Sequence, residues 1–408
     1  MSSLPPTPLT ARPLPPTGAW RAGDPAGQRR FADVVDGRPF HLEGGGVLRH
    51  VTVAYETWGT LAPDGSNAVL VCHALTGDSH AAGRASDGHQ GPGWWDGLIG
   101  RGRGIDPDRW FVVCANVLGG CQGSTGPSSI DPDTGAPYGS AFPVVTIRDM
   151  VRVQAKLADH LGIEQWAALV GGSMGGMQVL EWCVMFPERV RSAFTIATSA
   201  QASAQQIAWS AVGRRAITND PNFCGGDYYD RPDGEGPHLG LALAREIAQI
   251  HYRSESVFAA RFGRKQLDPL DAMGTFSLGQ RFVVVGYLDY HGAKFVRRFD
   301  ANTYLRLNKA MDLHDLGRGR GGVVPALQRV RCPVMVMSIR SDTLYPPYQQ
   351  HELRDVLRTL GNRVGYYDID SPDGHDGFLL EARQISPIVA AFLDGADDHF
   401  FRDDRGHR

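Results

Sequence analysis

The stretch from Ala168 to Gln178 constrains the fold of this chain more than any other part of the sequence. A short apolar run ends in Gly171-Gly172-Ser173-Met174-Gly175, and a helix-like segment follows and stops near Pro187. This order predicts a sharp turn from a buried strand into a helix, with the serine hydroxyl lifted out of the backbone. Glycines suit such a turn because neighbouring strands leave no room for a Cβ atom. Ser173 is therefore a candidate nucleophile for acyl transfer.

Two other glycine motifs do not fit this stretch. A dinucleotide-binding fingerprint needs Gly where Ser173 stands, and a phosphate-binding loop needs Lys where Met177 stands. The remaining alternative is a glycine-rich tight turn with an uninvolved serine. The two interpretations differ in whether the rest of the chain supplies catalytic partners for Ser173.

A serine nucleophile requires a base that takes its proton and a carboxylate that orients the base. At a strand-to-helix elbow, the order along the chain is Ser, then Asp or Glu, then His. Asp342 follows the apolar strand pattern of 333–338, and His375 follows the alternating pattern of 364–369. Both would lie just past the carboxyl ends of strands, where open α/β sheets bind their ligands. We assign Asp342 as the orienting carboxylate and His375 as the base.

Other assignments of the same residues stay open at this point. Asp342 lies in a Ser-Asp-Thr sequence, which also suits a turn or a helix cap. His375 lies in a glycine-rich loop and could be a surface histidine. Three further carboxylates are weaker candidates because none follows a strand in the required order: Asp312, Asp315 and Asp368.

Acyl transfer also needs preorganised N–H donors for the oxyanion that forms on the carbonyl oxygen. One donor is expected to be the backbone amide of Met174, the residue after the nucleophile. The second should come from the loop after an earlier strand, which the apolar run 67–73 predicts. We assign it to the amide of Leu75 in that loop. Ordinary packing of the Leu75 side chain is compatible with this role, because only the backbone takes part.

The order of patterns along the chain predicts an α/β fold with inserted helices. A hairpin pattern and then strand patterns alternating with helices indicate a mostly parallel sheet covered on both faces. From residue 200 to 320 the strand signal fades and helical patterns predominate, which predicts a helical cap over the active site. The predicted divisions are a Pro-rich flexible arm at 1–30, a core at 31–199 and 321–393, a cap at 200–320, and a charged tail at 394–408.

Composition excludes several classes of function. The 41 basic and 44 acidic residues give a net charge of −3, so no basic surface for nucleic acid is expected. No apolar run reaches 18 residues, and the Pro-rich start lacks the apolar centre of a signal peptide. The six cysteines form no C-x-x-C motif and are expected to be reduced thiols. We therefore expect a cytoplasmic protein with no metal site and no membrane partner.

Several motifs together resemble one family, the homoserine O-acetyltransferases of the α/β-hydrolase superfamily. The resemblance covers residues 35 to 393. The motifs that carry it are Cys72-His-Ala-Leu-Thr-Gly-Asp78, Gly93-Trp-Trp-Asp96, Asn116-Val-Leu-Gly-Gly-Cys121, Gly123-Ser-Thr-Gly-Pro-Ser-Ser129, Phe142-Pro-Val-Val-Thr-Ile-Arg-Asp149, Gly171-Gly-Ser-Met-Gly-Gly-Met-Gln178, Phe299-Asp-Ala-Asn302 and Gly374-His-Asp-Gly-Phe-Leu379.

The resemblance implies the α/β-hydrolase fold with its cap inserted after the sixth strand. It places Ser173, Asp342 and His375 on the family's triad and implies an acetyl-Ser173 intermediate. It also adds residues that spacing does not reveal. Arg245 and Tyr252 match positions that hold the amino-acid acceptor, where a guanidinium suits a carboxylate. Asp376 matches a position that pairs with the acceptor's ammonium group, and Thr76 matches another substrate contact.

The activity implied by the resemblance is acetyl transfer from acetyl-CoA, a co-substrate, to the hydroxyl of L-homoserine in methionine biosynthesis. It implies no tightly bound cofactor, and a homodimer formed through the cap helices. Some members of the family use succinyl-CoA, and some acylate serine. The sequence of the loop at Thr76 and Met174 at the elbow look more like the acetyl users. An esterase or thioesterase, and a non-catalytic binding protein on the same fold, are alternatives from other classes.

Overall fold

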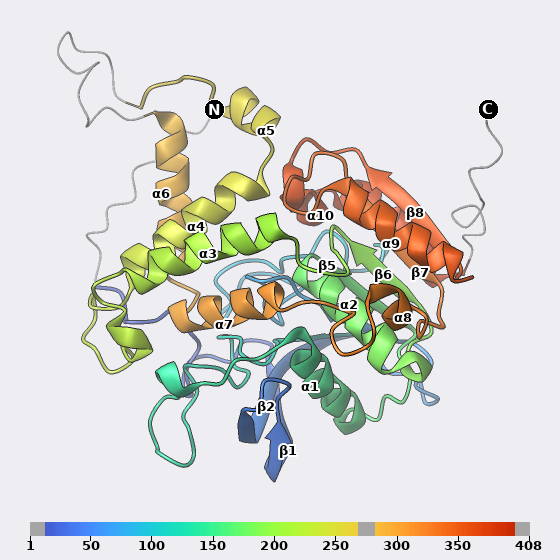
Figure 1. Ribbon diagram of the computed structural model, residues 1–408. Coiled ribbons are helices and arrows are strands. Elements are labelled where there is room, and N and C mark those ends of the chain that lie inside the picture. The colour runs from blue at the N-terminus through green and yellow to red at the C-terminus, as the bar shows by residue number, and fades with distance from the viewer. Residues whose placement is uncertain (1–12, 268–281, 396–408) are drawn as a thin grey trace.

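A computed structural model describes residues 13–267 and 282–395. Its centre is an eight-stranded sheet with the strand order β1-β2-β4-β3-β5-β6-β7-β8 (Figure 1). The first two strands pair antiparallel with each other and β2 pairs antiparallel with β4, whereas all the other pairs are parallel. The strands are β1 (Arg30–His41), β2 (Val47–Trp58), β3 (Ala68–Cys72), β4 (Phe111–Ala115), β5 (Ala168–Gly172), β6 (Ala193–Ile196), β7 (Val334–Ile339) and β8 (Val364–Ile369).

The central strands are short because they are buried on both faces. Every residue of β3, β5, β6 and β7 is buried, and most of them are aliphatic. Strands of this kind occur where helices cover both sides of a parallel sheet. The outer hairpin β1–β2 instead contains both buried and exposed residues, as expected for a partly solvated antiparallel edge. The mostly parallel sheet expected from the sequence is confirmed.

Helices on the two faces of the sheet bury separate clusters of apolar side chains. Among them, α1 begins with a capping box, in which Thr146 and Asp149 satisfy each other's backbone amides. Helix α2 is buried along nearly its whole length, and it packs against β3, β5 and β6. The helices of the core are α1 (Ile147–His160), α2 (Met174–Met185), α8 (Val323–Leu327), α9 (Pro347–Thr359), α10 (Gly377–Leu380) and α11 (Ala382–Leu393).

The segment between β6 and β7 forms the helical insertion expected after the sixth strand (Figure 1). Its helices α3, α4, α6 and α7 pack against one another and lie together on one side of the sheet. They are α3 (Ala204–Thr218), α4 (His238–Tyr252), α5 (Glu255–Arg261), α6 (Val283–Phe295) and α7 (Ala301–Asp312). These helices lie in the stretch from residue 200 to 320 where helical patterns predominate in the sequence.

Much of the expected N-terminal arm lies against the body of the protein. The Gly18 amide donates to the Phe299 carbonyl (3.2 Å), and the Trp20 amide donates to the Cys121 carbonyl (2.9 Å). The buried Thr17 hydroxyl donates to Asp300 (2.8 Å). Residues 13–29 are therefore held by backbone bonds to the cap and the core, which a Pro-rich composition does not indicate. Residues 1–12 of the arm and 396–408 of the charged tail lie outside the described residues.

No helix in the described ranges combines the length and the apolar character needed to cross a bilayer.

Candidate active site

Ser173 lies at the turn between β5 and α2 in a backbone conformation that is rare for a non-glycine residue. Its φ is 57° and its ψ is −126°. The turn brings α2 so close to the neighbouring strand that a Cβ atom on Gly175 would lie 2.1 Å from the Cys72 carbonyl oxygen. A Cβ on Gly171 would lie 2.5 Å from backbone atoms of Gly175. These two close approaches explain why the turn requires glycines, and the strained serine has the geometry of a nucleophile elbow.

Three residues predicted from the sequence meet at this turn. The Nε2 atom of His375 is 2.8 Å from the Ser173 Oγ. The Nδ1 atom of His375 is 2.7 Å from Asp342 Oδ2. The other carboxylate oxygen of Asp342 accepts hydrogen bonds from the amides of Leu344 (2.8 Å) and Tyr345 (2.9 Å). The carboxylate is thereby held in one orientation, and it fixes which nitrogen of the imidazole faces the serine.

The triad is enclosed by protein. Ser173, Asp342 and His375 are each at most 4% exposed. The imidazole of His375 stacks on the Tyr345 ring, with centroids 5.0 Å apart and planes 30° apart. The Phe378 ring lies 5.2 Å away on another side. This packing restricts rotation of the base and keeps bulk water from the nucleophile, which strengthens electrostatic interactions inside the site.

The competing carboxylates are engaged elsewhere. Asp312 pairs with Arg214 at 2.6 Å. Asp315 accepts a hydrogen bond from the Gly317 amide in a local turn (2.7 Å). Asp368 accepts from the hydroxyl groups of Ser338 on the neighbouring strand β7 and of Tyr366 on its own strand, β8. Asp342 is thus the carboxylate that contacts His375.

Both predicted oxyanion donors lie beside the serine in the fold. Met174 is the first residue of α2, and the first amides of a helix have no partner within the helix. Leu75 lies in the tight turn after β3, closed by a bond from the Gly77 amide to the Ala74 carbonyl (2.9 Å). Strand β3 is the direct neighbour of β5, so this turn and the elbow lie at the same edge of the sheet. The assignment of Leu75 and Met174 as donors stays a prediction.

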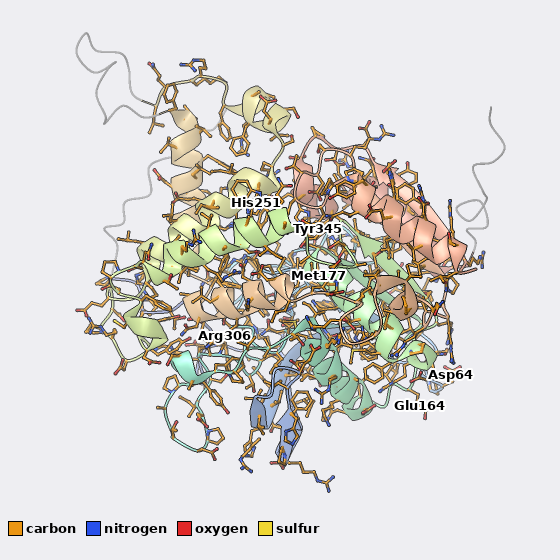
Figure 2. The ribbon with its side chains drawn as sticks, viewed as in Figure 1. Asp64, Glu164, Met177, His251, Arg306 and Tyr345 are labelled. Atoms are coloured by element: carbon orange, nitrogen blue, oxygen red, sulfur yellow. The ribbon has the colours of Figure 1, made fainter. Side chains whose placement is uncertain are left out.

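A small cavity of about 30 Å³ lies where the cap meets the core. Leu75, Tyr252 and Tyr345 line it together with His251, whose ring stacks on Trp209. Figure 2 shows His251 of α4 and Tyr345 of the loop after β7 near each other, above Met177 of α2. Burial lowers the pKa of His251 to about 3, so this imidazole is neutral near pH 7. The cavity is large enough for about one or two water molecules.

Arg245 and Tyr252 project from the same helix, α4. The Arg245 guanidinium lies 5.6 Å from the centroid of the Tyr252 ring and 5.2 Å from that of Phe295. The Tyr252 ring is in turn 5.8 Å from the imidazole of His375. Burial raises the pKa of the Tyr252 phenol to about 12, so the hydroxyl stays protonated. A fixed cation and a neutral hydroxyl thus stand next to the triad.

Asp376 has a partner that sequence reasoning missed. Arg253 lies directly after α4, and its Nε atom is 3.1 Å from Asp376 Oδ2. The Nη1 atom of Arg253 is 2.6 Å from Asp373 Oδ1. Burial nevertheless raises the pKa of the Asp376 carboxyl, against the opposing effect of Arg253. Gly374 packs so tightly on this region that a Cβ would lie 2.7 Å from the Tyr252 carbonyl oxygen. The cap is therefore fastened directly to the turn that carries His375.

The remaining predicted contact, Thr76, also has a partner that the sequence did not indicate. Its carbonyl oxygen accepts a hydrogen bond from Arg298 Nη1 (2.9 Å). In the sequence, Arg253 is marked only by its place directly after Tyr252, a predicted substrate contact, and Arg298 only by its place directly before the Phe299–Asn302 motif. Their acidic or carbonyl partners lie 120 and 222 residues away in the chain.

One cluster has side chains of the kind that hold metal ions. Potential ligand atoms of Glu56, His80 and His89 lie within 4.8 Å of one another, and all three residues are buried. The two imidazole planes are nearly parallel, 10° apart, with centroids 3.8 Å apart. Stacked rings cannot both direct an in-plane lone pair at one ion. The His89 Nε2 already accepts from the Gln28 amide (3.1 Å), so the cluster has the features of a buried hydrogen-bond network.

Comparison with known proteins places the geometry in context. Residues 67–382 match the model of the alpha/beta hydrolase fold. The chain is 54% identical to a homoserine O-acetyltransferase of Thermobifida fusca (strain YX), over 94% of this chain and 98% of the relative. It is 51% identical to a homoserine O-acetyltransferase of Carboxydothermus hydrogenoformans, over 86% of this chain and 92% of the relative.

Solved structures resemble the chain at lower identity. The homoserine O-acetyltransferase from Bacillus anthracis superposes with a TM-score of 0.82 at 28% identity, covering 90% of this chain and 98% of that one. Esterase E22 superposes with a TM-score of 0.81 at 29% identity, covering 90% and 99%. Structural similarity by itself therefore does not separate a transferase from an esterase.

Proposed function

The chain belongs to the homoserine O-acetyltransferase family of α/β hydrolases, and from this we propose that it transfers an acetyl group from acetyl-CoA to the hydroxyl of L-homoserine. The observation that carries the proposal is the Ser173–His375–Asp342 chain of contacts at 2.8 and 2.7 Å, buried beneath a cap that presents Arg245. The product, O-acetyl-L-homoserine, belongs to methionine biosynthesis.

In the first half-reaction, His375 removes the proton from the Ser173 hydroxyl as Oγ attacks the thioester carbonyl of acetyl-CoA. The C=O electron pair moves onto oxygen, which the amides of Leu75 and Met174 stabilise. The C–S bond then breaks, the proton on His375 goes to the departing sulfur, and free CoA leaves. The acetyl group remains on Ser173 as an ester. Asp342 stabilises the imidazolium form of His375 throughout.

In the second half-reaction, the hydroxyl of homoserine takes the place of the thiol. His375 accepts the proton of the homoserine hydroxyl while the homoserine oxygen attacks the acetyl-Ser173 carbonyl. The ester bond to Ser173 then breaks. The proton returns to the serine oxygen, and O-acetylhomoserine is released. This is a ping-pong sequence, because CoA leaves before the acceptor reacts.

Selection of the acceptor is assigned to the charged groups around Tyr252. Arg245 supplies a fork of N–H donors that matches the homoserine carboxylate. Asp376 is the candidate partner of the ammonium group, and because it also contacts Arg253 the substrate would share this carboxylate. Thr76 is assigned a further substrate contact. An α-amino acid fits this arrangement better than a neutral alcohol or water, since the site presents both charges.

Transfer is favoured over hydrolysis by enclosure of the acyl-enzyme. The nucleophile is 4% exposed, and aromatic rings surround the base. A charged acceptor held next to the ester reacts with a high effective concentration, which favours it over water. Hydrolysis is nevertheless the main competing function, because esterase E22 shares the fold with a TM-score of 0.81.

We also propose that the protein is a homodimer and that it is cytoplasmic. Along α4, Leu239, Leu243 and Ile250 are 74%, 48% and 49% exposed. Large apolar side chains gathered on one helix are typical of a surface that another protein covers. This apolar face supports association through the cap helices.

The experiment that tests the proposal measures thiol release from acetyl-CoA or succinyl-CoA, each with and without L-homoserine. We expect release from acetyl-CoA that depends on homoserine, and almost none from the Ser173→Ala variant. L-Serine in place of homoserine tests the other acceptor. If the enzyme prefers succinyl-CoA, the proposed mechanism stands but the acyl donor is succinyl-CoA and not acetyl-CoA. Release without any acceptor would make the protein a thioesterase and overturn the acceptor roles of Arg245, Tyr252 and Asp376.

A further inference from the structure

A second, larger cleft opens beside the triad. Its volume is about 810 Å³, within the range of clefts that bind organic ligands. Three parts of the chain form most of its walls, and Gln122 completes them: the N-terminal segment 15–29, the loop 76–94 after β3, and the end of α6 with the residues up to Arg298. None of the roles assigned above for the acetyl group or homoserine uses a space of this size.

The inner end of this cleft adjoins the reacting groups. Thr76 lines the cleft and directly follows Leu75, whose amide is the candidate oxyanion donor. Arg298 lines the same end and donates to the Thr76 carbonyl (2.9 Å). The Arg298 guanidinium lies 5.6 Å from the Phe295 ring, on which Arg245 also lies. A molecule whose thioester carbonyl occupies the oxyanion site could therefore continue outward through the cleft.

One wall of the cleft is cationic. Lys294, Arg297 and Arg298 follow one another at the end of α6 and all three line the cleft. Lys294 and Arg297 are exposed, and none of the three forms a salt bridge with an acidic side chain of the described residues. Lys294 also lies in the last turn of α6, where a cation stabilises the helix dipole, but Arg297 lies beyond the helix. A helix-capping role therefore does not account for the whole group.

The acidic side chains of the cleft lie on the other walls. Asp24 belongs to the N-terminal segment and accepts from the Arg21 amide (2.7 Å). Asp78 and Asp87 belong to the loop after β3, and Asp78 accepts from the His80 amide (2.8 Å). Arg29 of the N-terminal segment also lines the cleft, but its guanidinium already donates to the Gly88 carbonyl (2.8 Å) and to Gln122 Oε1 (2.9 Å). The wall of Lys294, Arg297 and Arg298 therefore holds most of the positive charge of the cleft. An elongated anion would bind along the cationic wall.

Two indoles, those of Trp20 and Trp94, also line the cleft. Trp20 Nε1 donates to the Pro25 carbonyl (3.2 Å), and Trp94 Nε1 donates to the Asp78 carbonyl (2.9 Å). Both rings are anchored by these bonds, and both line the cleft. A fixed indole is a suitable surface for the planar face of a nucleobase.

We propose that this cleft binds the nucleotide end of the acyl-CoA donor, with its phosphate groups along the wall of Lys294 and Arg297 and its adenine near the indoles. The inference rests on the proposed function, since it requires a CoA thioester as donor. It assigns a role to residues 15–29, which would form one wall of the donor site. Arginine and lysine side chains are the usual partners of phosphate groups.

The test compares two donors that carry the same thioester. Acetyl-CoA has the phosphates and the adenine, whereas S-acetylpantetheine lacks both. The variant is the double charge reversal Lys294→Glu, Arg297→Glu. The matched control is Arg38→Glu, Arg331→Glu, two exposed arginines outside the cleft that change the net charge equally. Homoserine is saturating, and kcat and KM are measured for each donor.

We expect the Lys294/Arg297 variant to raise the KM for acetyl-CoA roughly tenfold or more, because charge-assisted bonds to phosphate are lost. Its kinetics with S-acetylpantetheine and its homoserine KM should match the wild type, and the control pair should change little with either donor. If circular dichroism shows that the reversed pair is misfolded, the neutral pair Lys294→Gln, Arg297→Gln should give a smaller effect with the same dependence on the donor.

Two results would overturn the inference while leaving the proposed function intact. One is a wild-type enzyme that uses S-acetylpantetheine with the same KM as acetyl-CoA. The other is an equal effect of the Lys294/Arg297 change on both donors. If the wild type transfers no acetyl group from acetyl-CoA, the proposed function itself fails, and the two failures are thereby distinguished.

Discussion

Replacement of Asp342 by Asn tests how the structure sets the tautomer of the base. One oxygen of Asp342 accepts from the amides of Leu344 and Tyr345, and the other contacts His375 Nδ1 at 2.7 Å. Only the oxygen of an Asn side chain could accept from the two amides, so its NH₂ group would face Nδ1. The imidazole would then accept at Nδ1 and present its N–H to the Ser173 oxygen, where a proton acceptor is needed.

The magnitude follows from the loss of the general base. The wrong tautomer in a serine triad lowers kcat by about 10⁴-fold. This corresponds to roughly 5 kcal/mol in the activation free energy. The folded structure should be kept, because the two amide bonds at the other oxygen are still made. We therefore expect Asp342→Asn to have nearly wild-type thermal stability. Asp342→Ala leaves both buried amides without an acceptor and should be less stable by about 1–3 kcal/mol per unpaired amide.

The assay is homoserine-dependent release of CoA from acetyl-CoA, followed with a thiol reagent, beside thermal unfolding of each variant. Asp370→Asn is the matched control, since Asp370 is an exposed carboxylate 3.7 Å from Arg340. It should keep wild-type turnover. A drop of less than about 100-fold in kcat for Asp342→Asn would refute the argument that the two amides dictate the orientation of the side chain.

Three further predictions address the clamp, the elbow and the cavity. Arg245→Ala should raise the homoserine KM at least tenfold and leave the rate of acetyl-enzyme formation unchanged in a burst assay; an unchanged KM would count against the carboxylate clamp. Gly175→Ala should destabilise the protein by about 1–3 kcal/mol or more and abolish turnover, because its Cβ would lie 2.1 Å from the Cys72 carbonyl oxygen. Gly213→Ala in α3, whose Cβ would have its nearest contact at 3.5 Å, is the control and should stay fully active. Burial lowers the pKa of His251 to about 3, so the folded state resists its protonation and stability should fall as the pH drops from about 6.5 toward 3. His251→Gln should reduce this loss in unfolding measured against pH, and identical slopes for the two proteins would contradict the assignment.

The elbow and the buried strands could be predicted because both depend on short stretches of chain. The strand, the strained serine and the start of α2 lie within the eleven residues 168–178, and each has a local pattern. The buried strands could be predicted likewise, because each is a short, mostly apolar run. Ser173, Asp342 and His375 could then be ordered, because parallel strands bring their carboxyl ends to one edge of the sheet.

Other features were not visible in the sequence because long-range packing decides them. The helix α6 has a largely apolar start, but Lys294 in its last turn and Arg297 just beyond its end line a cleft whose other walls come mainly from residues 15–29 and 76–94. The Pro-rich composition of the N-terminal segment predicts a flexible arm. The amides of Gly18 and Trp20 nevertheless donate hydrogen bonds to backbone carbonyls of the cap and the core. No local pattern records such partners.

By itself, therefore, the sequence determined the strand-to-helix elbow, the mostly parallel sheet and the chemical type of each residue in the triad. These follow from backbone sterics and from burial of apolar runs, which act over a few residues. Only the tertiary structure decided that Arg253 contacts Asp376 and that a cationic cleft opens beside Thr76. Each of these depends on residues that are far apart in the chain and meet only because the cap packs on the core.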